Sequence, residues 1–264
     1  MDDPKTVFWL SAHPEPRSLN GQLRRMGIKH LKSTGHHVVE SDLYAMGWDP
    51  VVRGDGLVEA GQRFDPTGDT KRAYIEGSLP SDVRGEQAKL QDADAVVVQF
   101  PLWWYAVPAI LKGWFDRVLV SGFAFGKDPD TGQRLRFEKG PFQGKRVLVL
   151  VTLGDRPRAI GPRGKSGELC ELLFGLLHGT FAYTGMVVLP PMAFPSADFT
   201  DNESYADMEH ALHDRLDQLF ETQPIHYRPQ FQGDYTEEWE LVPEVRPGET
   251  GLSTHVIDDH ERPS

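Results

Sequence analysis

Short continuous apolar runs alternate along this chain with segments of helical periodicity. Two of the runs, "DAVVVQFPLWW" from Asp94 and "KRVLVLVTLG" from Lys145, do not alternate with polar residues. Continuous apolar strands are typical of a parallel sheet, because helices cover both of its faces and bury both sets of side chains. The pattern therefore predicts an α/β fold.

Three further runs bring the expected number of strands to five, and a helical pattern follows each strand except the second, which is followed by an irregular stretch. The first of these helices is predicted to begin at Ser18 as N-cap and to stop at Gly35. Ala45 to about Leu79 is expected to be a long irregular excursion. The order predicts a doubly wound five-stranded parallel sheet with strand order 2-1-3-4-5. The additional strands are "TVFWLSA", "HVVESDLY" and "MVVLPPMAF", and the later helices are "DVRGEQAKLQDA", "PAILKGWFDRVLV", "GELCELLFGLLHGTFAYTG" and "SYADMEHALHDRLDQLFET".

The chain is long enough for one large domain, which we expect to span residues 1–222. Residues 223–264 are acidic and rich in proline and have no clear helical or strand period. Such a segment cannot form its own core. It is predicted to pack on the domain or on a dimer partner, or to be partly disordered.

Charge and composition exclude several classes of function. The net charge of −11 argues against a nucleic-acid partner, since phosphate binding needs clustered lysines and arginines. No apolar run approaches the roughly 18 residues of a membrane span, so no membrane insertion is expected. One cysteine, Cys170, fits a reducing compartment, and a cytoplasmic location is expected.

Ligands of such sheets bind at the carboxyl ends of the strands, which here means the loops after the first, third and fourth strands. The first loop offers a phosphate site from Arg17, Ser18 and Asn20 at the start of a helix. Taken alone, Ser18 is better explained as a helix cap, and His13 as a packed, hydrogen-bonded histidine. The dinucleotide pattern G-x-G-x-x-G is absent, and no histidine pattern indicates a metal site.

The second loop, "PLWWYAVP" from Pro101, is the most informative. Trp103 and Trp104 directly follow a buried strand, where aromatic faces and backbone amides suit a flavin ring. The alternative is that these rings belong to the core or to a dimer interface, and for Trp114 and Phe115 on the next helix that alternative is favoured. In the third loop a P-loop is excluded because Ala159 occupies the position of the required glycine.

With these features the chain resembles the NAD(P)H:quinone oxidoreductases of the DT-diaphorase type, a flavodoxin-like family of dimeric flavoenzymes. The resemblance covers nearly the whole chain and is most specific in the stretch from Gln99 to Val118. It implies a flavodoxin-like sheet, a homodimer and bound FAD, with FMN less expected because of the C-terminal extension. The other matching segments are "AHPEPRSLN", "GHHVVESDLYAM", "GFAF", "KGPF", "RLDQLFETQPIHYRP" and "GLSTH".

The resemblance also implies roles for individual residues. Contacts to the flavin phosphates and the adenosine side are implied for His13, Ser18, Leu19 and Asn20. The ring system is expected to lie between two loops, formed by Pro101, Leu102, Trp103, Trp104 and Tyr105 on one side and by Thr152, Leu153, Gly154 and Asp155 on the other. Ala124 and Phe125 would line the pocket for substrate and nicotinamide, and Asp116 would contact flavin from the neighbouring region of the dimer.

The chain departs from the family at positions that matter for catalysis. A tyrosine and a histidine of the fourth-strand loop are replaced by Ile160 and Ser166, and Trp103 stands in place of a glutamine. Phe125 and Lys127 replace two pocket tyrosines, and an insertion, "KDPDTGQRLRFE", follows. The loop instead carries arginines, whose charge would stabilise a reduced anionic flavin. The predicted catalytic residues are Trp103, Phe125, Arg156 and Arg158.

The predicted function is therefore FAD-dependent oxidation of NAD(P)H, with two-electron ping-pong hydride transfer to a quinone or a similar small acceptor. One alternative is reduction of nitro or azo compounds on the same scaffold. Another is a flavin-binding regulatory subunit of a potassium efflux system, a role in which the missing tyrosine and histidine would be tolerated.

Overall fold

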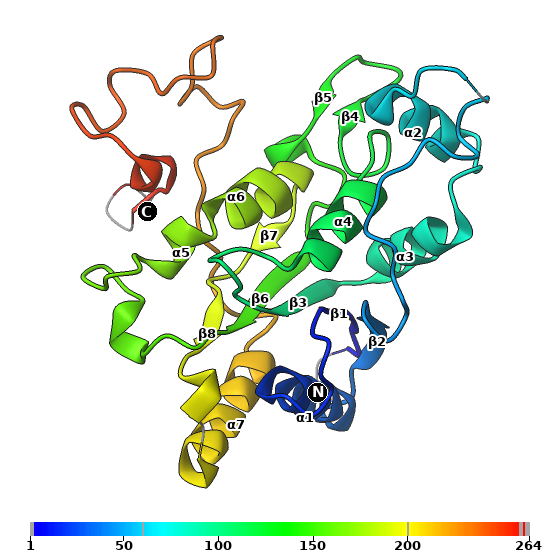
Figure 1. Cartoon of the computed structure of the whole chain (residues 1–264). Helices are drawn as coiled ribbons and strands as arrows, with labels where there is room; N and C mark the ends of the chain where they lie inside the picture. The colour runs from blue at the N-terminus through cyan, green and yellow to red at the C-terminus, as the bar shows by residue number, and fades with distance from the viewer. Residues whose placement is uncertain (1–2, 60, 200, 259–260, 262–264) are drawn as a thin grey trace.

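The computed structural model describes residues 3–59, 61–199, 201–258 and 261, and its core is a parallel sheet (Figure 1). The strands are β1 (Thr6–Ser11), β2 (His37–Asp42), β3 (Ala95–Pro101), β6 (Arg146–Thr152), β7 (Val187–Val188) and β8 (Met192–Phe194). Their order is β2-β1-β3-β6-β7, and β8 also pairs with β6. The predicted order 2-1-3-4-5 is confirmed. The fifth strand is split because Pro190 and Pro191 cannot donate to the ladder.

Helices cover both faces of the sheet, as the continuous apolar strands predicted. Trp9 and Val97 face α1 and α7, whereas Phe8 and Val98 face the side of α3 and α4. The helices are α1 (Leu19–Ser33), α2 (Pro66–Ile75), α3 (Ser81–Asp92), α4 (Ala109–Val118), α5 (Leu169–Leu172), α6 (Phe174–Leu176) and α7 (Asn202–Asp217). None of the helices in the described ranges is both long and apolar enough to cross a membrane.

Helix α1 begins and ends where the sequence indicates. Ser18 caps it by accepting a hydrogen bond from the Gly21 N–H at 3.1 Å, and Gly35 follows it with a φ of 95°. Gly27 lets the helix approach the sheet closely, because a Cβ there would lie 2.3 Å from the Trp9 ring. The α1 surface thus closes over the indole of Trp9.

Three segments differ from the prediction. The stretch after Ala45, expected to be irregular, contains α2. This helix was not predicted because its apolar periodicity is weak, although Asp65 and Pro66 supply a regular N-cap and first turn. The insertion forms a hairpin of β4 (Gly126–Lys127) and β5 (Arg134–Leu135). The long helix predicted to end near Gly185 is broken into α5, α6, the π-helix η3 (Leu177–Phe181) and the short η4 (Ala182–Thr184). Glycines inside this segment lower its helical propensity.

The C-terminal segment packs on the domain of its own chain over residues 223–258. The Ile225 N–H donates to the Val188 carbonyl at 2.8 Å, and the Glu138 carboxylate accepts from the N–H groups of Gln230 and Phe231 at 3.0 and 2.6 Å. Short 3-10 turns complete the chain at Phe137–Lys139, Pro157–Ala159, Ala197–Phe199 and Leu252–His255. The predicted division into residues 1–222 and 223–264 stays a prediction. At the ends of these two ranges, residues 1–2, 259–260 and 262–264 lie outside the described residues.

Candidate active site

The three loops singled out from the sequence lie next to one another because their strands are neighbours in the sheet. β3 pairs with β1 on one side and with β6 on the other. The pairing continues past the strands, since the Leu102 N–H donates to the Thr152 carbonyl at 2.8 Å and the Ala12 N–H to the Gln99 carbonyl at 3.0 Å. The carboxyl edge of the sheet therefore holds one continuous set of loops.

A buried chain of polar side chains forms the floor below these loops. Trp9 Nε1 donates to Gln99 Oε1 at 2.9 Å, and Gln99 Nε2 donates to the Asn20 carbonyl at 2.7 Å. Asn20 Nδ2 then donates to Thr152 Oγ1 at 3.2 Å. The structure thus brings Asn20 and Thr152 together. Trp9 and Gln99 were missed as site residues, and the signal was Gln99, a polar residue within an apolar strand.

The first loop places a helix N-terminus at this edge. Ser18 Oγ lies 3.0 Å from His13 Nδ1, which in turn lies 3.1 Å from the Glu15 N–H. Burial lowers the pKa of His13, which favours the neutral form of the ring. Arg17 is exposed and paired with Glu15 at 3.0 Å, and Leu19 packs against the core. The free N–H groups of the first turn of α1 suit a phosphate.

The second loop exposes aromatic rings on a strained backbone. Trp104 is 98 % exposed, and both Trp104 and Tyr105 have positive φ angles, 53° and 55°. The Trp103 ring lies 6.0 Å from the ring of His13 and so joins this loop to the first. Pro101 and Leu102 are buried and anchor the loop to the sheet, whereas Trp114 and Phe115 are core residues as expected.

The third loop is fixed to the second through one carboxylate. Asp155 accepts hydrogen bonds from Tyr105 Oη and Ser166 Oγ, both at 2.8 Å, and from Lys165 Nζ at 3.2 Å. These hydrogen bonds, that of Ser166 above all, lower the pKa of Asp155. Leu153 is buried, and Ile160 packs against the core.

The arginines of this loop are not neutralised by carboxylates. Arg156, Arg158 and Arg163 are exposed, and none of them forms a salt bridge with a described residue. A hollow of about 620 Å³ opens between this loop and the end of β8. Its wall includes Gly154, Arg156 and Lys165, together with Phe199, which is 82 % exposed.

Three predicted residues lie elsewhere in the chain. Ala124 and Phe125 follow α4, near the amino edge of the sheet, where the neighbouring Phe123 packs on Phe142 with ring centroids 5.2 Å apart. Asp116 is paired with Lys112 at 2.6 Å. One chain alone does not bring these residues to the carboxyl edge, and their roles stay predictions.

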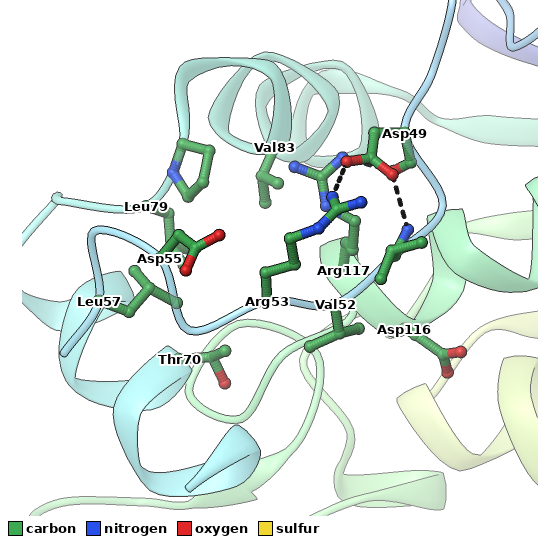
Figure 2. A pocket seen from close by; sticks show the side chains of 12 residues that line it. Asp49, Val52, Arg53, Asp55, Leu57, Thr70, Leu79, Val83, Asp116 and Arg117 are labelled. Carbon is green, nitrogen blue, oxygen red and sulfur yellow. Dashed lines mark hydrogen bonds and ion pairs between the residues drawn. The ribbon is translucent and has the colours of Figure 1, made fainter. Parts of the chain in front are cut away.

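Asp116 lines a different hollow, of about 280 Å³ (Figure 2). There Arg53 and Arg117 gather beside Asp49, whose carboxylate is bonded to Arg53. The backbone carbonyl of Asp49 accepts a hydrogen bond from Arg117 at 2.7 Å. The arginines of this hollow are therefore already partnered within the chain, unlike Arg156, Arg158 and Arg163 of the third loop.

Comparison with known proteins agrees with this geometry. The family model described as "Flavodoxin-like fold" matches residues 5–219. A ribosyldihydronicotinamide dehydrogenase-like protein, traD, from Penicillium crustosum is 42 % identical over 87 % of this chain and 86 % of its own. NAD(P)H dehydrogenase [quinone] 1 from Rattus norvegicus is 35 % identical over 92 % of this chain and 89 % of its own.

A solved structure extends the agreement to three dimensions. A Klebsiella pneumoniae protein assigned as a quinone reductase superposes with a TM-score of 0.91 at 44 % identity, covering 96 % of this chain and all of that one. The family model gives the fold, and the sequence relatives and the solved structure point to quinone oxidoreductases with that fold. The chain belongs to the flavodoxin-like NAD(P)H:quinone oxidoreductase family.

Proposed function

We propose that the protein is an FAD-dependent NAD(P)H oxidoreductase that reduces quinones or similar small acceptors. The observation that carries the proposal is the exposed Trp103–Tyr105 loop, hydrogen-bonded to the β6 loop at the carboxyl edge. A bound flavin would supply two-electron chemistry, taking hydride from NAD(P)H and giving it to the acceptor in ping-pong order. The chain would supply aromatic surface, orientation and charge.

The residues present fit FAD. The first turn of α1 would hold the phosphates, with Ser18 as cap, and the two loops meeting at Tyr105 and Asp155 would flank the ring system. The hollow beside Phe199 and Arg156 is large enough to take an adenosine and offers it an aromatic face and positive charge. This hollow supports FAD over FMN.

A homodimer would complete the site. Ala124, Phe125 and Asp116 lie away from the carboxyl edge of their own chain, so Ala124 and Phe125 could line the substrate pocket, and Asp116 could contact the flavin, only in a second copy. The names of the relatives also indicate two donor classes, NAD(P)H and ribosyldihydronicotinamide. A donor panel should therefore include both.

The proposal is tested by the absorbance spectrum of the purified protein before and after anaerobic addition of NADPH, NADH or dihydronicotinamide riboside. We expect a flavin spectrum that bleaches on mixing, and FAD released on denaturation. Released FMN would correct the cofactor. No flavin binding after addition of FAD would refute the proposal.

Replacing Arg156, Arg158 and Arg163 singly with alanine should slow flavin reduction by NADPH about tenfold in at least one variant. The reason is that an unpaired guanidinium stabilises negative charge that develops on the ring, and tenfold corresponds to about 1.4 kcal/mol. Stopped-flow absorbance measures the rate. Arg84→Ala, on the exposed side of α3, is the matched control. Unchanged rates in all three variants would remove the arginines from catalysis.

A further inference from the structure

Tyr105, Asp155 and Ser166 form a closed triangle of hydrogen bonds at the carboxyl edge. Tyr105 Oη and Ser166 Oγ each donate to Asp155 Oδ2 at 2.8 Å, and the two hydroxyls lie 2.9 Å apart. Lys165 Nζ approaches the other carboxylate oxygen at 3.2 Å. The carboxylate therefore has its hydrogen-bonding capacity directed at protein groups rather than at a ligand.

The triangle connects two loops that lie far apart in the sequence, and the backbone of Asp155 reaches a third. Tyr105 belongs to the loop after β3, and Asp155 and Ser166 stand at the beginning and the end of the arginine-bearing loop after β6. The backbone carbonyl of Asp155 also accepts the N–H of Ser196, in the loop after β8, at 2.9 Å. One residue thus joins every loop on this side of the predicted flavin site.

The triangle also offsets strain in the aromatic loop. Trp104 and Tyr105 both occupy the left-handed region, which costs a non-glycine residue of the order of 1 kcal/mol or more. Such conformations persist only where the surrounding structure fixes them. Tyr105 is fixed at its hydroxyl by Asp155 and Ser166, and without this anchor the exposed rings would lose their orientation.

We propose that Asp155 is the positioning residue of the flavin site: its carboxylate fixes Tyr105 to Ser166 and thereby sets the position of the Trp103–Trp104 rings and of the arginine-bearing loop. This inference rests on the proposed function. It replaces the expected direct contact of Asp155 with the cofactor by an indirect one, and it gives Ser166 a role as partner of the carboxylate.

Asp155→Ala tests the proposal first in the apoprotein. We expect amide hydrogen exchange to rise at least tenfold in residues 103–106 and in 156–166, with β3 and β6 unchanged. Asp207→Ala, an exposed aspartate on α7, is the control. Unchanged exchange in both loops would overturn the proposal, whether or not the protein binds flavin. This measurement therefore separates its failure from that of the proposed function.

A second measurement uses FAD. We expect Asp155→Ala and Tyr105→Phe to raise the Kd for FAD 10- to 100-fold and to change the visible circular dichroism of the bound flavin, whereas Ser166→Thr, which keeps the hydroxyl, retains both. A wild-type Kd and dichroism in Asp155→Ala would refute the positioning role. The positioning role would be supported if Ser166→Thr kept the wild-type Kd for FAD and the wild-type dichroism and Ser166→Ala did not.

Discussion

Replacing Gln99 with leucine is expected to lower the free energy of unfolding by about 2–4 kcal/mol. The change leaves the buried Trp9 indole N–H without its acceptor, which costs about 1–3 kcal/mol, and removes the hydrogen bond from Gln99 Nε2 to the Asn20 carbonyl, which contributes about 0.5–1.5 kcal/mol. Because Asn20 also bonds to Thr152 at the end of β6, the damage should reach the site. Urea unfolding followed by circular dichroism measures the loss.

Gln91→Leu is the matched control, since Gln91 is exposed on α3 and its change should stay within about 0.5 kcal/mol. The FAD affinity of Gln99→Leu, measured under conditions where the variant remains folded, should fall as well. A variant as stable as the control would show that the buried chain of hydrogen bonds contributes little. A stable variant with weakened FAD binding would assign Gln99 to the ligand instead.

The strands could be predicted from the sequence because burial on both faces leaves a local mark. The apolar runs that became β3 and β6 contain every residue needed to identify them. The N-cap at Ser18 can likewise be identified from a few neighbouring residues of the sequence. By contrast, α2 lacks an apolar stripe, and the helix after Leu169 breaks where internal glycines and tertiary packing decide the outcome.

The candidate site was predictable only in part, since loops are recognised locally but contacts between them are not. Trp103 and Trp104 could be read from their place after a strand. The Tyr105–Asp155 bond joins residues 50 positions apart, and no spacing rule indicates it. Likewise, nothing in the sequence around Phe125 indicates that this residue, which follows α4, lies near the amino edge of the sheet.

The protein is expected to lose stability as the pH falls from about 6.5 to about 4, because of His178. This ring is enclosed by Phe174, Tyr227 and Phe137, with centroids 4.7, 4.8 and 5.1 Å away, and His255 of the C-terminal segment stacks at 6.2 Å. Burial, followed by the charge on His255, lowers the pKa of His178 to about 4. Burial lowers the pKa of His255 too.

The sign follows from proton linkage. Between the unfolded pKa of about 6.5 and the folded value, the unfolded chain binds a proton that the folded chain excludes, so stability is complete above this range and falls within it. The slope is at most about 1.4 kcal/mol per pH unit for one histidine, and the total about 1–3 kcal/mol, since water reaches part of the ring.

Urea unfolding at several pH values between 4 and 8 measures this slope. His178→Phe should flatten it, because phenylalanine keeps the ring packing and does not titrate, and His37→Gln, at an exposed position, should not. Glu261, whose pKa is lowered to about 2 chiefly by its hydrogen bond to Arg228, begins to lose its contribution as the pH falls below about 4.5, so the histidine slope is best measured above that pH. An equal slope in His178→Phe and wild type would mean that the C-terminal segment packs on this histidine without coupling its protonation to folding.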